Sequence, residues 1–127
     1  MTNKLQKRHG TALITWINRH ILTMDIPDDA GLGTGQATRL QVASRMLIAF
    51  TLHLNNQPIT CTAIVDGGGG SETKVNYTLA YLSRLKILTA TAKLASHGAG
   101  RVHHYSFSDS FTATILRVHT GIGTDDI

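Results

Sequence analysis

Polar side chains that can form hydrogen bonds in several directions cluster at residues 71–77. These candidate binding residues are Ser71, Thr73, Lys74, Asn76 and Tyr77. An asparagine amide can pair with an adenine edge through two hydrogen bonds, and a lysine can reach guanine or a phosphate. A threonine can contact a thymine methyl group, and a tyrosine hydroxyl can bond phosphate. Together these side chains could contact a nucleic acid, and each of them taken alone is equally typical of an ordinary exposed polar surface.

Basic residues extend this candidate surface toward the C-terminus. The segment from Lys74 to Ser108 contains no Asp or Glu, but it contains Arg84, Lys93 and Arg101. We expect Arg84 and Lys93 to add contacts to phosphates, and Arg101 to enter a minor groove or to hold phosphate. The formal net charge of +4 is modest, and it does not identify a polyanionic partner by itself.

Catalysis and metal binding have little support in the sequence. No nucleophile motif, carboxylate pair or phosphate loop is visible, so we expect a protein that is not an enzyme and needs no cofactor. His97, His103 and His104 are close in sequence, but adjacent strand residues point to opposite faces, so at most two can converge. We therefore expect no metal site, with metal sensing as an alternative. Cys61 has no basic neighbour, so we expect a small buried residue, with a redox sensor as the alternative.

Apolar periodicity predicts the elements that come before this surface. A helix is expected over Thr11–Met24, and Pro27 with its acidic neighbours ends it. The glycine-rich loop Ala30–Gly35 does not fit a dinucleotide motif and is read as a linker. A longer helix is expected from about residue 36 to 55, with Arg39 and Arg45 on its solvent side. Its apolar stripe is predicted to be Leu40, Ala43, Leu47, Phe50 and Leu54.

The candidate binding residues should lie at the start of a later helix. A short helix at 60–65 is followed by four glycines, and Ser71 can cap a helix over 72–86. Its inner face is predicted to be Val75, Leu79, Leu82 and Leu85. The period then changes to two, which predicts strands at 88–94 and 101–107 joined by a hairpin tip at 96–100. A last helix, capped by Asp109 or Ser110, precedes an end expected to fray from Gly121. The fold class is α+β, mostly α.

This order of elements resembles the winged helix-turn-helix transcriptional regulators, most closely the MarR type. The resemblance is carried by Pro58-Ile59-Thr60, by the segment 71–77, by the apolar positions of the following helix and by Lys86-Ile87-Leu88 before the hairpin. It implies a recognition helix at about 71–86 in a major groove of double-stranded DNA, and a wing at about 88–107 on the backbone or minor groove. Four glycines instead of one, and a short wing with a single arginine, depart from the family pattern.

The resemblance also implies flanking dimerisation helices. We expect an N-terminal dimerisation segment at 1–35, a DNA-binding domain at 36–110 and a C-terminal helix and tail at 111–127. The first helix is apolar on more than one side, which suggests burial against a second subunit. The expected homodimer contacts are Leu13, Ile14, Ile17 and Ile21. A small-molecule effector would fit the family, but no residue identifies one.

The broad class follows from composition. The longest apolar run is Met46–Phe50, no signal peptide is visible, and the chain has one cysteine, so we expect a cytoplasmic, bacterial-type protein without a membrane partner. Two other functions stay open for the same fold: a module that binds another protein, and a DNA-binding protein of plasmid or phage replication.

Overall fold

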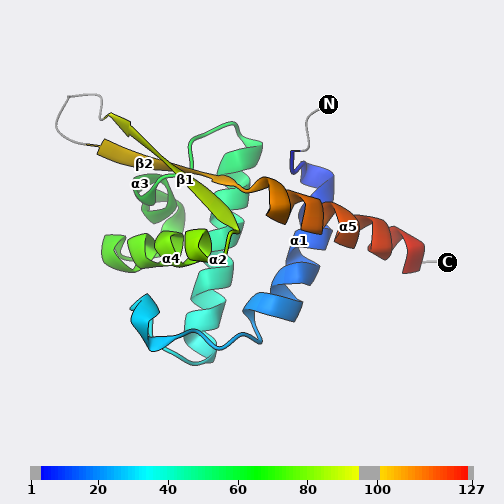
Figure 1. Cartoon of the computed structure of the whole chain (residues 1–127), viewed down its shortest axis with the longest axis horizontal. Helices are drawn as coiled ribbons and strands as arrows, with labels where there is room; N and C mark the ends of the chain where they lie inside the picture. Colours follow the sequence, from blue (N-terminus) through cyan, green and yellow to red (C-terminus); the bar gives the residue numbers. More distant parts are fainter. Residues whose placement is uncertain (1–3, 95–100, 126–127) are drawn as a thin grey trace.

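The computed structural model describes residues 4–94 and 101–125, which form an α+β fold that is mostly helical (Figure 1). Among the described residues, none of the helices combines the length and the apolar character that crossing a membrane requires. The elements are α1 (Gly10–Trp16), α2 (Gln36–Leu54), α3 (Cys61–Ile64), α4 (Glu72–Arg84), β1 (Leu88–Leu94), β2 (Arg101–Phe107) and α5 (Asp109–Asp125). Wider π-helical turns extend α1 over Ile17–Ile21 and α3 over Val65–Gly69, and single 3-10 turns lie at Lys7–His9 and Asp28–Ala30.

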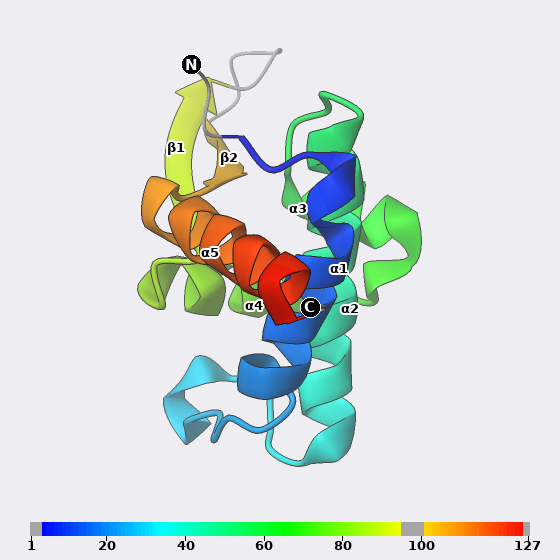
Figure 2. The ribbon, with the colours of Figure 1, turned by 90° about the vertical axis from the view of Figure 1, so that its right-hand side faces the viewer.

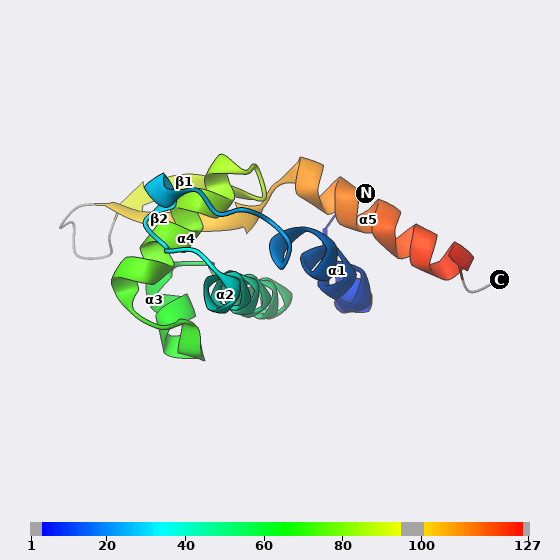
Figure 3. The ribbon, with the colours of Figure 1, turned by 90° about the horizontal axis from the view of Figure 1, so that it is seen from below.

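Helix α2 is the central element, with α1 on one side and α3 and α4 on the other (Figure 3). The predicted helix is confirmed, but its predicted stripe is wrong in part, because Leu40 and Leu47 are 51% and 37% exposed. The residues buried instead are Val42, Ala43, Arg45, Met46, Ala49 and Phe50. This face of α2 contacts neighbouring elements on two sides, which the spacing of the leucines alone could not indicate.

Arg45 is the clearest departure on α2. It was expected on the solvent side, yet it is only 5% exposed. Its Nε donates to the carbonyl of Gly69 at 2.7 Å, and its Nη1 donates to Thr78 Oγ1 at 2.9 Å. These acceptors explain how a charged side chain can lie among core residues. Arg39 is half-buried, and its Nη1 donates to the carbonyl of Met24 at 3.4 Å.

The glycine turn between α3 and α4 is packed rather than loose. Gly68 and Gly70 have φ angles of 96° and 104°, which side chains rarely tolerate. A Cβ on Gly69 would lie 2.5 Å from the Ile64 side chain, so this glycine permits a close approach. Ser71 Oγ accepts from the Lys74 amide at 3.3 Å, which confirms the predicted cap of α4. The four glycines therefore build a defined turn.

The predicted hairpin is confirmed. Strands β1 and β2 pair antiparallel from Leu88 opposite Phe107 to Leu94 opposite Arg101, and the predicted tip at 96–100 lies outside the described residues. Helix α4 ends at Arg84, two residues early, because Lys86 adopts a φ of 65° and the Ile87 amide returns to the Leu82 carbonyl. This ending leaves Leu85, predicted to face inward, 38% exposed.

Helix α5 packs across α1 (Figure 2) and runs to Asp125, so the expected fraying from Gly121 is wrong. Its cap is Ser108, whose Oγ accepts from the Phe111 amide, and not Asp109 or Ser110. Of the four residues expected at a dimer interface, three are buried inside this chain: Leu13, Ile17 and Ile21. These apolar side chains had suggested a second subunit, but they pack against α5 and α2 of the same chain. Only Ile14 is exposed, at 49%.

Candidate nucleic-acid interface

The first half of α4 presents an open polar face. Val75, Leu79 and Leu82 are buried as predicted, while all five candidates of the 71–77 cluster are exposed. Thr73 and Asn76 lie three residues apart and therefore on one side of the helix. Neither side chain forms a hydrogen bond to any other described residue, so both are free to bind a partner.

A second face of α4 is covered by the linker between α1 and α2. We call residues 24–31 the strap. Lys74 Nζ donates to the carbonyl of Gly31 at 2.8 Å. Gly31 has a φ of 74°, and a Cβ at this position would lie 3.0 Å from the Tyr77 ring. The side chains of Lys74 and Tyr77 therefore hold the end of the strap, although both residues were expected to face DNA.

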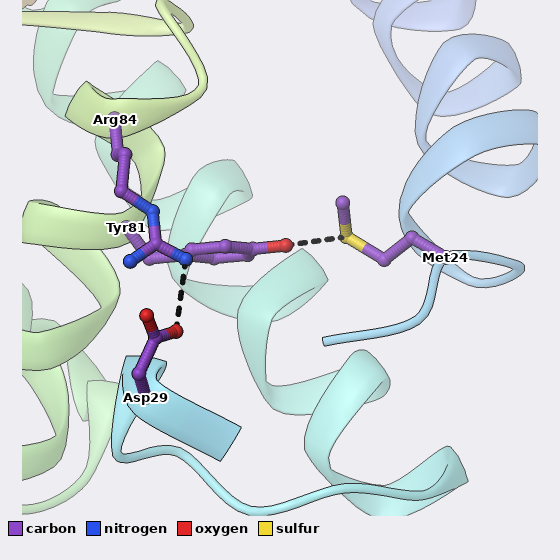
Figure 4. Close-up of polar contacts among 4 residues, drawn as sticks. All are labelled: Met24, Asp29, Tyr81 and Arg84. Carbon is purple, nitrogen blue, oxygen red and sulfur yellow. Dashed lines mark hydrogen bonds and ion pairs between the residues drawn. The ribbon is translucent and has the colours of Figure 1, made fainter. Parts of the chain in front are cut away.

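The other end of the strap is held one helical turn further along α4 (Figure 4). Arg84 Nη2 lies 3.2 Å from Asp29 Oδ1, and its guanidinium carbon is 5.4 Å from the centre of the Tyr81 ring. The Tyr81 hydroxyl donates to the sulfur of Met24 at 3.9 Å. Burial, opposed by Arg84, raises the pKa of Tyr81. The Tyr81 side chain is therefore part of the contact with the strap.

The strap divides the predicted contacts on α4 into two sets. Ser71, Thr73 and Asn76 belong to the open set, whereas Lys74, Tyr77 and Arg84 already have partners in the strap. The strap also brings the exposed acids Asp28 and Asp29 toward the basic helix. Sequence reasoning missed this contact, although the separation of an acidic 25–29 segment from an acid-free 74–108 segment was a signal for it.

The hairpin places the other two basic candidates on neighbouring rungs. Lys93 is opposite Val102, and Arg101 is opposite Leu94. Both positions lie at the far end of the hairpin from the start of β1, where the chain leaves α4. The pairing of the two strands therefore places two basic positions close together, away from the core.

Cys61 is partly buried, and its Sγ donates to the Glu72 carbonyl at 3.5 Å. Burial, and then the charge of Glu72, raise the pKa of this thiol. A raised pKa favours the unreactive thiol, whereas oxidant sensing needs a thiolate. The environment of Cys61 thus agrees with a packing role.

Histidines do not gather into a metal centre in the part of the chain that the structure describes, where no group of three or more His, Cys, Asp or Glu residues could hold an ion. His103 is exposed and stacks on Tyr105 with ring centres 6.3 Å apart. His97 lies outside the described residues. His103 and His104 are adjacent residues of β2, the first exposed and the second partly buried.

A separate cleft of about 880 Å³ lies between the N-terminal segment, the end of α2, β2 and the start of α5. Its lining combines Lys4, His53, Tyr105 and Asp109. His53 Nε2 is 2.8 Å from the carbonyl of Leu5, so the wall is built partly by the N-terminal segment. Both charge signs occur here, and the cleft is separate from the open face of α4.

No protein-family model, curated protein or solved structure matches this chain.

Proposed function

We propose that this chain is a sequence-specific transcriptional regulator that binds double-stranded DNA with a winged helix-turn-helix similar to the MarR type. In this proposal α3 and α4 form the helix-turn-helix, and β1 and β2 form the wing. The packed glycine turn supports it, because such a motif requires a fixed angle between its two helices. The pairing of the Tyr105 amide with the Ile59 carbonyl at 2.9 Å also supports it, since it ties the hairpin to the segment before α3.

The observation that carries the proposal is the open face of α4. Asn76 and Thr73 lie within the first two turns, and the N-terminal residues of a helix in a major groove are those that reach base edges. Asn76 can form two hydrogen bonds with adenine, which contributes about 1–3 kcal/mol of discrimination. Thr73 can contact a thymine methyl group beside it. Sequence is therefore read by these two residues.

Charge sets the orientation of the duplex. Lys93 and Arg101 on the hairpin would contact the DNA backbone or the minor groove while α4 occupies the major groove. Ser71 lies at the start of α4, where the helix dipole favours a phosphate. Lys74 and Arg84 join the contacts when they exchange their strap partners, the Gly31 carbonyl and Asp29, for phosphates, and Tyr77 joins them through its hydroxyl group. While these side chains remain bound to the strap, the strap limits the affinity of the protein for DNA.

A homodimer completes the proposal. Two copies would place their α4 helices in successive major grooves, roughly 34 Å apart, on a pseudo-palindromic site. Ile14 is the residue available for this contact, because the other three candidates belong to the core of the protomer. We place this regulator in a bacterial cytoplasm, with its effector unassigned.

The test is selection of bound sequences from a pool of random duplexes, repeated across a salt series. We expect a two-fold symmetric motif from the native protein and loss of adenine preference in Asn76→Ala. Asn18→Ala is the matched control, because Asn18 is an exposed asparagine beyond α1 and far from α4 in sequence. Binding that falls steeply with salt and enriches no sequence would show that the protein binds DNA only non-specifically, through its basic surface. Absence of binding at low salt would instead favour a module that binds another protein.

A further inference from the structure

Arg45 carries a buried charge that no acid compensates. Its two hydrogen-bond acceptors, the Gly69 carbonyl and Thr78 Oγ1, are both neutral. The one ion pair within the described residues joins Arg84 to Asp29 and does not involve Arg45. Burial alone lowers the pKa of its guanidinium. A buried cation without a countercharge is costly even when it is hydrogen-bonded, so an anion bound beside Arg45 would stabilise this arrangement.

The third guanidinium nitrogen of Arg45 is the one left free. Nη2 has no acceptor in the residues for which the structure gives side chains. Ser83 Oγ is the only fully buried side-chain polar atom without a partner in the described part of the chain. Nη2 is therefore not sealed from solvent, although the side chain as a whole is 5% exposed. One N–H group of a core arginine is thus left open to solvent.

This group lies at the glycine turn before α4. A Cβ on Gly70 would be 3.1 Å from Arg45 Nη2, so only the absence of a side chain leaves this nitrogen uncovered. Gly70 directly precedes Ser71, the N-cap of α4. The first intrahelical bond runs from the Val75 amide to the Ser71 carbonyl, and Ser71 Oγ occupies the Lys74 amide. The amides of residues 71–73 are consequently left without acceptors inside the helix.

We propose that Arg45 Nη2 and the free amides at the start of α4 form an oxyanion site that takes a phosphate group. The guanidinium supplies charge from beneath the turn, and the amides supply donors at the positive end of the helix dipole. In the proposed function, the occupant is a backbone phosphate of the duplex whose bases contact Thr73 and Asn76, so this assignment of the source rests on that function. Glu72, exposed in the first turn, opposes the anion and sets its affinity.

The first arm of the test uses inorganic phosphate and no DNA. Amide chemical shifts of the native protein are followed by nuclear magnetic resonance during a phosphate titration, with chloride keeping the ionic strength constant. We expect saturable shifts confined to Gly69–Thr73 and the Arg45 Nε signal, reduced in Arg45→Lys. Glu72→Gln, which leaves Arg45 in place, should bind phosphate more tightly. Linear or scattered shifts, or shifts that are unchanged in Arg45→Lys, would overturn the site.

The second arm uses duplex DNA and measures how log affinity depends on log salt concentration. Arg45→Gln should reduce the magnitude of this slope by about 1, the value for one lost phosphate contact. Arg117→Gln is the matched control, because it removes the same charge from an exposed position on α5. If Arg45→Gln does not fold, judged by thermal unfolding, the affinity itself is compared in Arg45→Lys, which keeps the charge, and therefore the slope, but loses the Nη2 donor; weaker binding is expected, and an unchanged affinity would count against the site.

The two arms distinguish a failure of the oxyanion site from a failure of the proposed function. Saturable phosphate shifts without duplex binding would keep the oxyanion site for a free phosphate compound and reject the regulator. Duplex binding with an unchanged slope in Arg45→Gln, or an unchanged affinity in Arg45→Lys, together with no saturable shifts, would reject the site and keep the regulator.

Discussion

The guanidinium of Arg84 lies 3.2 Å from the carboxylate of Asp29, a residue 55 positions earlier in the chain. Both side chains are well exposed, at 50% and 74%, and such surface ion pairs contribute about 0–1 kcal/mol. The strap is therefore held mainly by its buried apolar residues, Ile26 and Ala30, and by the Tyr81 ring. A contact with so small an electrostatic contribution can be broken by a duplex that offers Arg84 a phosphate.

Asp29→Asn tests this competition. The substitution removes both the ion pair and a negative charge beside α4, so we expect tighter duplex binding with a steeper salt dependence. The free energy of unfolding should change by less than about 1 kcal/mol. Asp25→Asn is the control, because it makes the same charge change at another exposed residue of the strap, which has no ion pair within the described chain. Equal effects of the two variants would show that net charge, and not release of Arg84, is responsible.

Tyr81→Ala tests how the strap is anchored. The Tyr81 ring is buried, so its removal should lower the free energy of unfolding by about 3–5 kcal/mol, as for other large aromatic residues. Tyr81→Phe is expected to cost far less, because the hydroxyl contact with the Met24 sulfur at 3.9 Å is weak. Urea unfolding of both variants measures the difference. A large loss in Tyr81→Phe would instead assign the anchoring to the hydroxyl group.

The segments predicted correctly from the sequence are those with local signals. The Ser71 cap depends on residues within one helical turn, and the hairpin depends on alternation within each strand. The start of α4 could therefore be placed to the residue. Its exposed polar side chains followed from the same periodicity that placed Val75 and Leu79 inside.

The features missed depend on contacts between distant parts of the chain. Arg45 is buried because the glycine turn supplies acceptors 24 positions later, and no local pattern on α2 announces this. Leu40 is exposed because α2 turns the face with Val42 and Met46 toward the core, while Ile21 is buried because its π-helical turn packs on α2. Hydrophobic spacing identifies a helix, but it does not choose among several apolar faces.

Acid should destabilise the N-terminal part of the fold through His9. This residue is buried, and its Nδ1 accepts a hydrogen bond from the Gln6 amide at 2.9 Å. The centre of its ring lies 4.9 Å from the centre of the His119 ring. Burial, then the charges of His119 and Arg8, lower its pKa below the ordinary value of 6.5. The folded state therefore binds its proton less readily than the unfolded state does. Its contribution to stability is complete above pH 6.5 and is lost as the pH falls toward the lowered value.

The measurement for His9 is the free energy of unfolding in urea between pH 7.5 and about pH 5, a range that spans histidine titration. His9→Asn keeps an acceptor for the Gln6 amide without a titrating ring, and we expect a flatter pH dependence from it. His20→Asn, a change at an exposed histidine, is the matched control. An unchanged profile in His9→Asn would assign the acid sensitivity to other groups.

The dimer prediction now depends on Ile14. Because this side chain is 49% exposed, Ile14→Lys should leave the protomer folded while it places a charge in the proposed interface. We expect light scattering to show a shift from dimer to monomer, with little change in the unfolding temperature measured on the monomer. Ile21→Lys buries a charge in the core and should unfold the chain at once, so it serves as the contrasting variant. A mass that stays at two chains in Ile14→Lys would remove α1 from the interface, and a native protein with the mass of one chain would reject the dimer itself.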